Sequence, residues 1–149
     1  MLQLLGGYYC VGDTGENIMG PQSSVYKLSE GESYWTKVNN MNHRRAYHAC
    51  TVLDNYIYVL GGHEAMLSVE RLDVSTMTWE SLPDLSFHLS GGQAFTYQSS
   101  VYVVEEYRNG TVARLNETNQ WDVITELKSL KDSNVFTTPI ITTAEILGC

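Results

Sequence analysis

The sequence lacks long apolar segments, and it contains few charged residues, few prolines and few cysteines. No uninterrupted apolar run approaches the roughly 18 residues that a membrane-spanning helix requires. Residues 1–7 lack the basic start and the long apolar stretch of a signal peptide. From these absences we expect a cytoplasmic protein that makes no membrane contact.

Cysteines and basic residues are scarce. The three cysteines, Cys10, Cys50 and Cys149, form no metal-ligand spacing, and any pairing of them leaves an odd thiol. A reduced intracellular protein is the simplest interpretation. Lys and Arg number 9 against 17 Asp and Glu, a formal net charge of −8. Because such a chain repels polyanions, nucleic-acid binding is not expected.

The residues that are present indicate a folded, sheet-rich protein. Of the 149 residues, 43% are hydrophobic and only 17% are charged, which is a globular composition. This length suits one domain with at most a small appendage. Ten tyrosines stand beside three phenylalanines and three tryptophans. Aromatic side chains pack well on pleated surfaces, so this composition favours β-structure.

The chain contains an internal repeat of about 44 residues. Trp35, Trp79 and Trp121 are separated by 44 and 42 residues, and an aliphatic residue stands three positions after each. A glycine pair follows an apolar run at Gly6-Gly7 and again at Gly61-Gly62. The third copy of the glycine pair is replaced by Glu105-Glu106. Landmarks that keep this register indicate a true structural repeat.

Within each repeat the apolar pattern has a period of two, which predicts strands. We expect strands at 46–53, 56–61, 67–73 and 77–82, and again at 91–98, 100–105, 111–116 and 120–125. A first, incomplete repeat has strands at 2–7, 23–28 and 33–38 with a loop insertion at 9–24, and a last one has strands near 135–142 and 144–148. Residues 122–133 also show near-helical apolar spacing, but the tryptophan register favours a strand followed by a turn.

The repeat resembles the Kelch repeat of β-propellers. The resemblance is strongest over 41–83, in the phrases Met41-Asn42-His43-Arg44-Arg45-Ala46-Tyr47-His48, Tyr56-Ile57-Tyr58-Val59-Leu60-Gly61-Gly62 and Met77-Thr78-Trp79. It implies an all-β fold: a Kelch-type β-propeller fragment of four-stranded antiparallel blades in an incomplete ring. The expected units are an incomplete blade at 1–40, full blades at 41–85 and 86–130, the latter divergent, and an incomplete blade at 131–149.

The repeated glycines and tryptophans are expected to have structural roles. A glycine pair lets the backbone turn where no Cβ would fit, which assigns Gly6, Gly7, Gly61 and Gly62 to turns. A tryptophan is large enough to fill the wedge between neighbouring blades while its indole N–H finds an acceptor. This assigns Trp35, Trp79 and Trp121 to blade interfaces.

Signals for catalysis are weak. The chain has no H-E-x-x-H, G-x-S-x-G, P-loop or C-x-x-C motif. Its four histidines, His43, His48, His63 and His88, match no metal-ligand spacing. We therefore expect no enzyme activity, no catalytic residue, no metal and no cofactor.

The resemblance implies a binding role. In Kelch propellers the loops after the second strand and those joining one blade to the next lie on one face, which binds partner peptides. The corresponding residues here are Arg44, Arg45, Tyr47, His63, Phe87, His88, Tyr107 and Tyr8. Arg45 stands where such propellers grip acidic side chains, a contact that suits the guanidinium. The alternative is that Arg44 and Arg45 only offset acidic neighbours on a solvated loop.

The expected function is therefore protein–protein interaction, as in the substrate-recognition adaptors of cullin-RING ubiquitin ligases. An actin-binding, cytoskeletal Kelch protein is an alternative of the same class. A fragment of a propeller oxidase or sugar epimerase, and a truncated product without function, are alternatives of other classes. Contact with actin or with a cullin ligase assembly would run through domains that this chain does not include.

Overall fold

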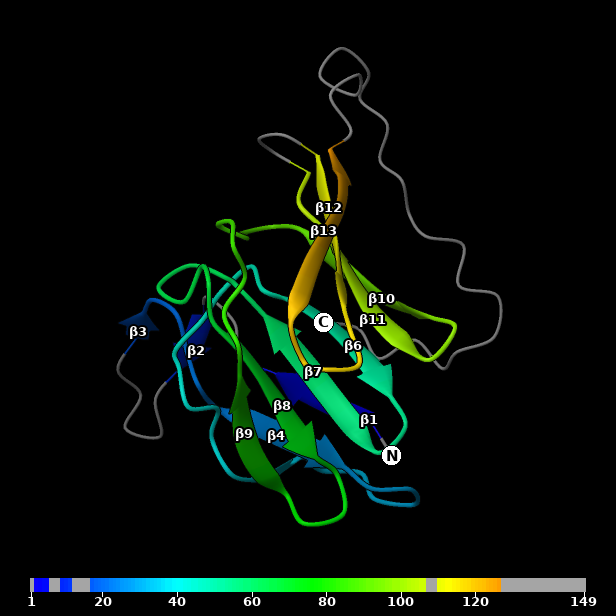
Figure 1. The fold of residues 1–149 in the computed structure, drawn as a ribbon. Coiled ribbons are helices and arrows are strands. Elements are labelled where there is room, and N and C mark those ends of the chain that lie inside the picture. The colour runs from blue at the N-terminus through cyan, green and yellow to red at the C-terminus, as the bar shows by residue number, and fades with distance from the viewer. Residues whose placement is uncertain (1, 6–8, 12–16, 107–109, 127–149) are drawn as a thin grey trace.

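The computed structural model describes residues 2–5, 9–11, 17–106 and 110–126, and all regular structure within these ranges is β-strand (Figure 1). The strands are β1 (Leu2–Leu5), β2 (Tyr9–Val11), β3 (Asn17–Met19), β4 (Val25–Leu28), β5 (Thr36–Lys37), β6 (Ala49–Leu53), β7 (Tyr56–Leu60), β8 (Val69–Asp73), β9 (Thr78–Leu82), β10 (Gln93–Tyr97), β11 (Ser100–Val104), β12 (Thr111–Leu115) and β13 (Trp121–Glu126). These described ranges hold no helix long and apolar enough to cross a membrane.

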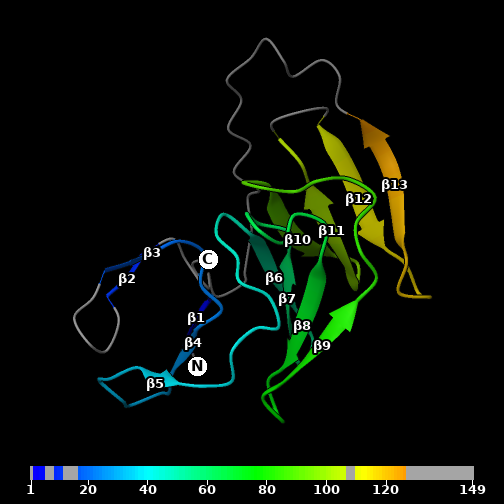
Figure 2. The ribbon, with the colours of Figure 1, turned by 90° about the vertical axis from the view of Figure 1, so that its left-hand side faces the viewer.

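The strands form consecutive antiparallel sheets. Strands β6-β7-β8-β9 make one four-stranded sheet and β10-β11-β12-β13 make another, each in sequence order. A three-stranded sheet has the order β1-β4-β5, and β2 and β3 form a separate hairpin. Figure 2 shows the β6–β9 sheet between the other two larger sheets. We call each of these three sheets a blade.

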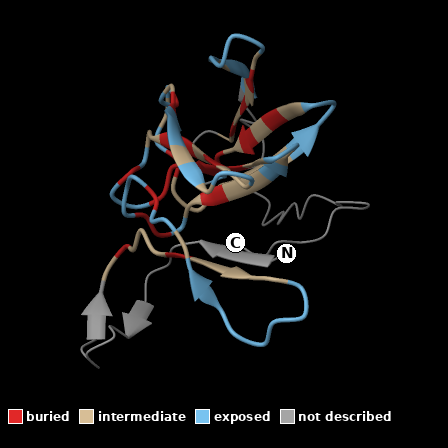
Figure 3. Cartoon of the chain, turned by 90° about the horizontal axis from the view of Figure 1, so that it is seen from below, coloured by how far each residue is buried: buried red, intermediate tan, exposed pale blue. Residues whose placement is uncertain are grey.

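Two apolar clusters hold the blades together, and Figure 3 shows the buried positions concentrated between the sheets. One cluster joins the β6–β9 blade to the β10–β13 blade, and the other joins the β1-β4-β5 blade to the β6–β9 blade. Strand β7 contributes to both, because Tyr58 and Leu60 point into the first cluster while Ile57 and Val59 point into the second. The middle blade is therefore buried on both faces.

Two tryptophans lie between neighbouring blades. The Trp79 Nε1–H donates to the Asn39 carbonyl at 3.0 Å, and the Trp121 Nε1–H donates to the Pro83 carbonyl at 3.0 Å. Each acceptor belongs to the segment that follows the preceding blade. Trp35, which the sequence analysis also assigned to a blade interface, is 42% exposed.

The expectation of an all-β fold with four-stranded antiparallel blades is confirmed. Each strand predicted between residues 23 and 125 overlaps an observed strand of the same blade. Residues 121–126 form strand β13, as the tryptophan register predicted. The hairpin β2–β3 was not predicted within the insertion at 9–24. The strands expected near 135–142 and 144–148 lie outside the described residues.

The expectation of a reduced chain is wrong at one position. Cys50, on strand β6, is disulfide-bonded in this structure. The side chains of Cys10 and Cys149 lie outside those that the structure describes. The cysteine count alone therefore did not predict the redox state of Cys50.

Candidate functional site

Three connecting segments meet at one end of the blades: 41–48 before β6, 61–68 between β7 and β8, and 83–92 between β9 and β10. We call this surface the loop face. Backbone hydrogen bonds join the segments: His63 N–H to Ala46 O (2.7 Å), Gly62 N–H to Leu89 O (2.8 Å), Leu89 N–H to Met66 O (2.8 Å) and Gly91 N–H to Tyr47 O (2.7 Å). Residues that are distant in sequence are therefore held on one ordered surface.

The glycine pair allows this close approach. Gly61 has a φ of 62°, and a Cβ at this position would lie 2.5 Å from the Leu89 carbonyl oxygen. Gly62 has a φ of 96°, and its Cβ would lie 2.8 Å from the Ala46 carbonyl oxygen. Both the left-handed backbone and the contact distance require glycine. The sequence analysis assigned Gly61 and Gly62 to turns; Gly6 and Gly7, assigned likewise, lie outside the described residues.

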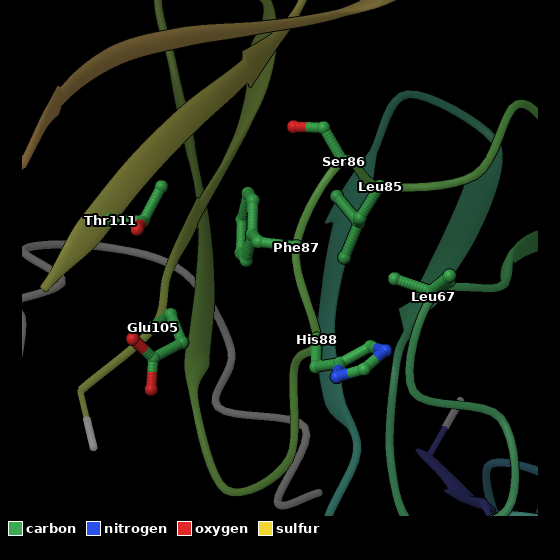
Figure 4. Close-up of a pocket in the computed structure, with 7 residues that line it drawn as sticks. All are labelled: Leu67, Leu85, Ser86, Phe87, His88, Glu105 and Thr111. Atoms are coloured by element: carbon green, nitrogen blue, oxygen red, sulfur yellow. The ribbon is translucent and has the colours of Figure 1, made fainter. Parts of the chain in front are cut away.

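A pocket of about 530 Å³ opens on the loop face between the β6–β9 and β10–β13 blades. Its lining residues are Leu67, Leu85, Ser86, Phe87, His88, Glu105 and Thr111. Figure 4 shows Phe87 between the Glu105–Thr111 side and the Leu85–Leu67 side. The pocket thus combines apolar walls with two hydroxyl groups, an imidazole and a buried carboxyl group.

Two of the predicted partner-binding residues, Phe87 and His88, line this pocket. Sequence reasoning missed Glu105, which follows β11, and Thr111, the first residue of β12; both line the pocket. A signal existed, because Glu105 replaces the first glycine of the pair that marks the preceding repeat. A charged residue in place of a turn glycine indicates that the loop after the second strand of this blade differs from the loop of the preceding blade.

Other predicted residues lie on the same face. Tyr47 is 60% exposed, and Arg44 and His63 are also exposed. The backbone hydrogen bonds at Tyr47 and His63 tie both residues into the three joined segments. Tyr8 and Tyr107 lie outside the described residues.

Arg45 needs a correction, because its side chain is completely buried. Its Nη2 lies 2.6 Å from Glu70 Oε1, and its Nη1 donates to the Gly61 carbonyl at 2.5 Å. Burial lowers the pKa of Arg45, and the charge of Glu70 opposes that shift. Arg45 therefore bridges the loop face to the sheet beneath it, and it is not accessible to a partner in this structure.

Glu70 is the partner that the sequence analysis did not identify. It lies on β8 with no exposed side-chain surface. In addition to Arg45, its carboxylate accepts the backbone N–H of Asn42 at 2.7 Å and that of His43 at 3.4 Å. A buried carboxylate that satisfies three donors anchors the first segment of the loop face.

His48 is the other polar side chain under this face. Burial, and next the charge of Arg45, lower the pKa of His48 to about 4. Both ring nitrogens are buried without a hydrogen-bond partner among the described residues. His48 is therefore neutral at pH 7. The same described ranges contain no group of three or more His, Cys, Asp or Glu residues arranged to hold a metal ion.

Comparisons with known proteins agree with the repeat and the fold. Residues 44–86 match the Kelch motif. A putative F-box/kelch-repeat protein of Arabidopsis thaliana is 33% identical over 100 residues, which cover 65% of this chain and 29% of that protein. Human Kelch-like protein 6 is 28% identical over 95 residues, covering 62% of this chain and 15% of that protein. The chain thus spans less than a third of either relative.

A solved structure, that of YjhT, superposes with a TM-score of 0.59 at 16% sequence identity, covering 70% of this chain and 45% of the other. At that identity the likeness concerns the fold alone. Three other observations agree with this fold: the motif match at 44–86, the four-stranded antiparallel sheets and the tryptophan contacts between blades. Residues 44–86 therefore match a Kelch repeat, and the described blades have a Kelch-type β-propeller fold.

Proposed function

We propose that the loop face binds a peptide segment of a protein partner, with the 530 Å³ pocket as its central contact. The observation that supports this most directly is the position of Phe87 and His88 in a concave, mixed apolar and polar pocket. Binding sites are usually concave and largely apolar, with a few polar groups that orient the ligand. Loops held by a rigid scaffold are also where binding residues concentrate. Tyr47 and His63 extend the contact beyond the pocket.

The lining residues suggest the chemistry of the bound side chain. Leu67, Leu85 and Phe87 offer apolar contact, and the hydroxyls of Ser86 and Thr111 offer hydrogen bonds. The acidic partner residues implied by the family resemblance would lie near the exposed Arg44.

We further propose that the partner is a substrate and that this chain recognises it as part of a cullin-RING ubiquitin-ligase adaptor. The support is the Kelch-like sequence pattern of residues 41–83 and the similarity to proteins named F-box/kelch-repeat and Kelch-like. The ligase-binding part would belong to sequence beyond these blades.

The binding proposal can be tested with a displayed peptide library selected on the immobilised chain. Ser86 is an exposed pocket residue, and Ser86→Trp should fill the pocket without disturbing the core. Selected peptides should bind the unmodified chain at least tenfold more tightly than the Ser86→Trp variant. Ser33→Trp, at an exposed bend of the first blade, is the matched control and should bind normally. Equal affinity for all three chains would refute the pocket as the contact site.

The adaptor proposal needs a second experiment. The chain is fused to an F-box domain, and ubiquitylation of a carrier protein bearing a selected peptide is measured in a reconstituted cullin-RING reaction. We expect modification that depends on the peptide and is lost in the Ser86→Trp fusion. Tight peptide binding without any ubiquitylation would leave the binding function intact and count against the adaptor role.

A further inference from the structure

One tyrosine on the loop face has a backbone conformation that its side chain disfavours. Tyr47 has a φ of 56°, in the left-handed region. Bulky residues rarely adopt this conformation, because the Cβ comes close to the following carbonyl oxygen. Most other non-glycine residues of positive φ in the described chain lie in hairpin turns at the opposite end of the blades: Asp54, Met77, Gln98, Ser99 and Asn119. Tyr47 therefore departs from the usual setting of such residues.

The equivalent position in the next blade is a glycine. Strand β6 begins at Ala49 and strand β10 at Gln93, so Gly91 stands where Tyr47 stands one blade earlier. The φ of Gly91 is 78°, which is also left-handed. Glycine adopts this conformation without strain. Both blades thus use the same kind of backbone here, and the β6–β9 blade places on it a residue that the backbone disfavours.

The surrounding structure holds Tyr47 in this conformation. Its carbonyl accepts the N–H of Gly91 at 2.7 Å, and the Ala46 carbonyl accepts the N–H of His63 at 2.7 Å. Ala46 and the preceding Arg45 are both completely buried. A strained residue persists where its neighbours fix the backbone in this way, and such residues cluster at binding and catalytic sites.

Packing of the tyrosine ring in the core does not account for the strain. Tyr47 is 60% exposed, and neither apolar cluster of the described blades includes it. Most of the ring surface is therefore accessible to a partner on the loop face.

Tyr47 is held next to a segment that also lines the pocket. The Met66 carbonyl accepts the N–H of Leu89 at 2.8 Å, and Gly91 donates to Tyr47, so both side chains lie along the same stretch of backbone. Met66 is 37% exposed and adds apolar surface there. His88, immediately before this stretch, lines the pocket. A peptide with a side chain in the pocket would therefore lie within reach of Tyr47.

We infer that Tyr47 determines the sequence specificity of the loop face, by contacting a large apolar side chain of the partner close to the residue that enters the pocket. This inference rests on the proposed peptide-binding function. Tyrosine offers a large contact area with few rotatable bonds, and it is common among the residues that dominate interface energies. The fixed backbone presents the ring already oriented, which lowers the entropic cost of binding.

Binding and stability measured on the same variants test this inference. Tyr47→Gly copies Gly91 of the next blade and removes the ring together with the strain. Peptides selected on the unmodified chain should bind this variant at least tenfold more weakly. Its urea denaturation midpoint should be no lower than that of the unmodified chain, because the relieved strain offsets the greater freedom of glycine in the unfolded state. Tyr47→Phe keeps the apolar ring and should bind as the unmodified chain does.

The matched control is Gln98→Gly. Gln98 is exposed and has a φ of 44°, in a hairpin turn at the end of the blades opposite the loop face. This variant should also keep its stability, and it should bind the selected peptides normally. Normal binding by Tyr47→Gly overturns the inference. A loss of stability together with affinity in Tyr47→Gly also overturns it, because the ring would then have a structural role.

Selecting the same peptide library on the Tyr47→Gly chain tests the chemistry of the partner. Peptides from the unmodified chain should carry a leucine, methionine or aromatic residue at one fixed position, and this preference should be absent from peptides selected on the variant. The same sequences from both selections would refute the role of Tyr47 while leaving the peptide-binding function intact. A failure of that function looks different: no peptide is enriched on the unmodified chain, and the inference falls with it.

Discussion

The Arg45 Nη2 and the Glu70 Oε1 lie 2.6 Å apart, and neither side chain has any exposed surface. At the same repeat positions one blade further on, Leu89 and Ala113 stand in place of this pair, and both are completely buried. A buried ion pair therefore lies at the interface between the first blade and the β6–β9 blade, and apolar side chains take the same positions at the interface between the β6–β9 and β10–β13 blades. Buried ion pairs and well-packed apolar groups can substitute for each other in this way.

Removing one member of the pair should be strongly destabilising. Glu70→Gln leaves the buried guanidinium of Arg45 without its counter-charge, and we expect a loss of about 3–5 kcal/mol in the free energy of unfolding. Glu80→Gln is the control, since the Glu80 side chain is 60% exposed in its pair with Arg71. It should cost less than about 1 kcal/mol. Urea denaturation measures both, and equal losses would contradict the structural role of Glu70.

The apolar pair of the next blade suggests a double variant. Arg45→Leu with Glu70→Ala copies Leu89 and Ala113 into the preceding interface. The double variant should be more stable than either single one, because it leaves no uncompensated buried charge. Strictly additive losses in a double-mutant cycle would show that the two side chains do not act as a pair.

The stability of the chain should fall on mild acidification because of His48. The folded-state pKa of His48 is about 4, below the ordinary value of 6.5. Between these values the unfolded chain binds a proton that the folded chain does not. The contribution of His48 to stability is therefore full above about pH 6.5, is lost progressively towards pH 4 and does not change further below it, with a total loss of at most about 3 kcal/mol.

The variant His48→Leu should flatten this part of the pH profile, as measured by thermal unfolding between pH 4 and 7. The exposed His63 provides the control, and His63→Gln should keep the slope of the unmodified chain. A slope that survives in His48→Leu would assign the acid sensitivity to another group.

Comparing the stability losses of two glycine-to-alanine substitutions distinguishes the cost of backbone strain from the cost of a steric clash. Gly61 and Gly31 both have positive φ, 62° and 80°, so alanine at either position costs about 1–2 kcal/mol of conformational strain. A Cβ at Gly61 would also meet the Leu89 carbonyl at 2.5 Å, whereas at Gly31 nothing lies within 4 Å. Gly61→Ala should therefore cost clearly more than Gly31→Ala in urea denaturation. Similar losses would mean that the backbone at Leu89 moves aside freely.

The indole hydrogen bond of Trp79 can be removed with little change in packing. Trp79→Phe keeps an aromatic ring in the wedge but loses the donor to the Asn39 carbonyl, which lies 3.0 Å from Nε1. We expect a loss of about 1–3 kcal/mol, which combines the hydrogen bond with some lost ring area. Trp35→Phe should cost less because Trp35 is 42% exposed. A larger loss at Trp35 would contradict its exposed position.

Most of the strands could be predicted because their signals are local. The run of β-branched and aromatic residues at β7 and the polar pair Asp54-Asn55 before it specify a strand and a tight turn within a few residues. The hairpin β2–β3 was missed because its strands are three residues each, too short to show alternation.

The candidate site was predicted less well. Phe87 and His88 were identified from their place in the repeat, and both line the pocket. Arg44 and Arg45 are identical in type and adjacent, yet one is exposed and the other is buried. The difference arises from Glu70, which is 25 residues further along the chain. No local pattern indicates which of two neighbouring arginines will meet it.

The order of residues along the chain was enough to establish the repeat, the β-structure and the turns, because each depends on neighbours a few positions away. The ion pair under the loop face, the pocket beside Glu105 and the exposure of Trp35 depend on how whole blades pack against one another. Packing brings together groups that are far apart in sequence, and burial then sets their charge and accessibility. For that reason the surface proposed to bind a partner depends on how the blades lie side by side, and local sequence does not determine it.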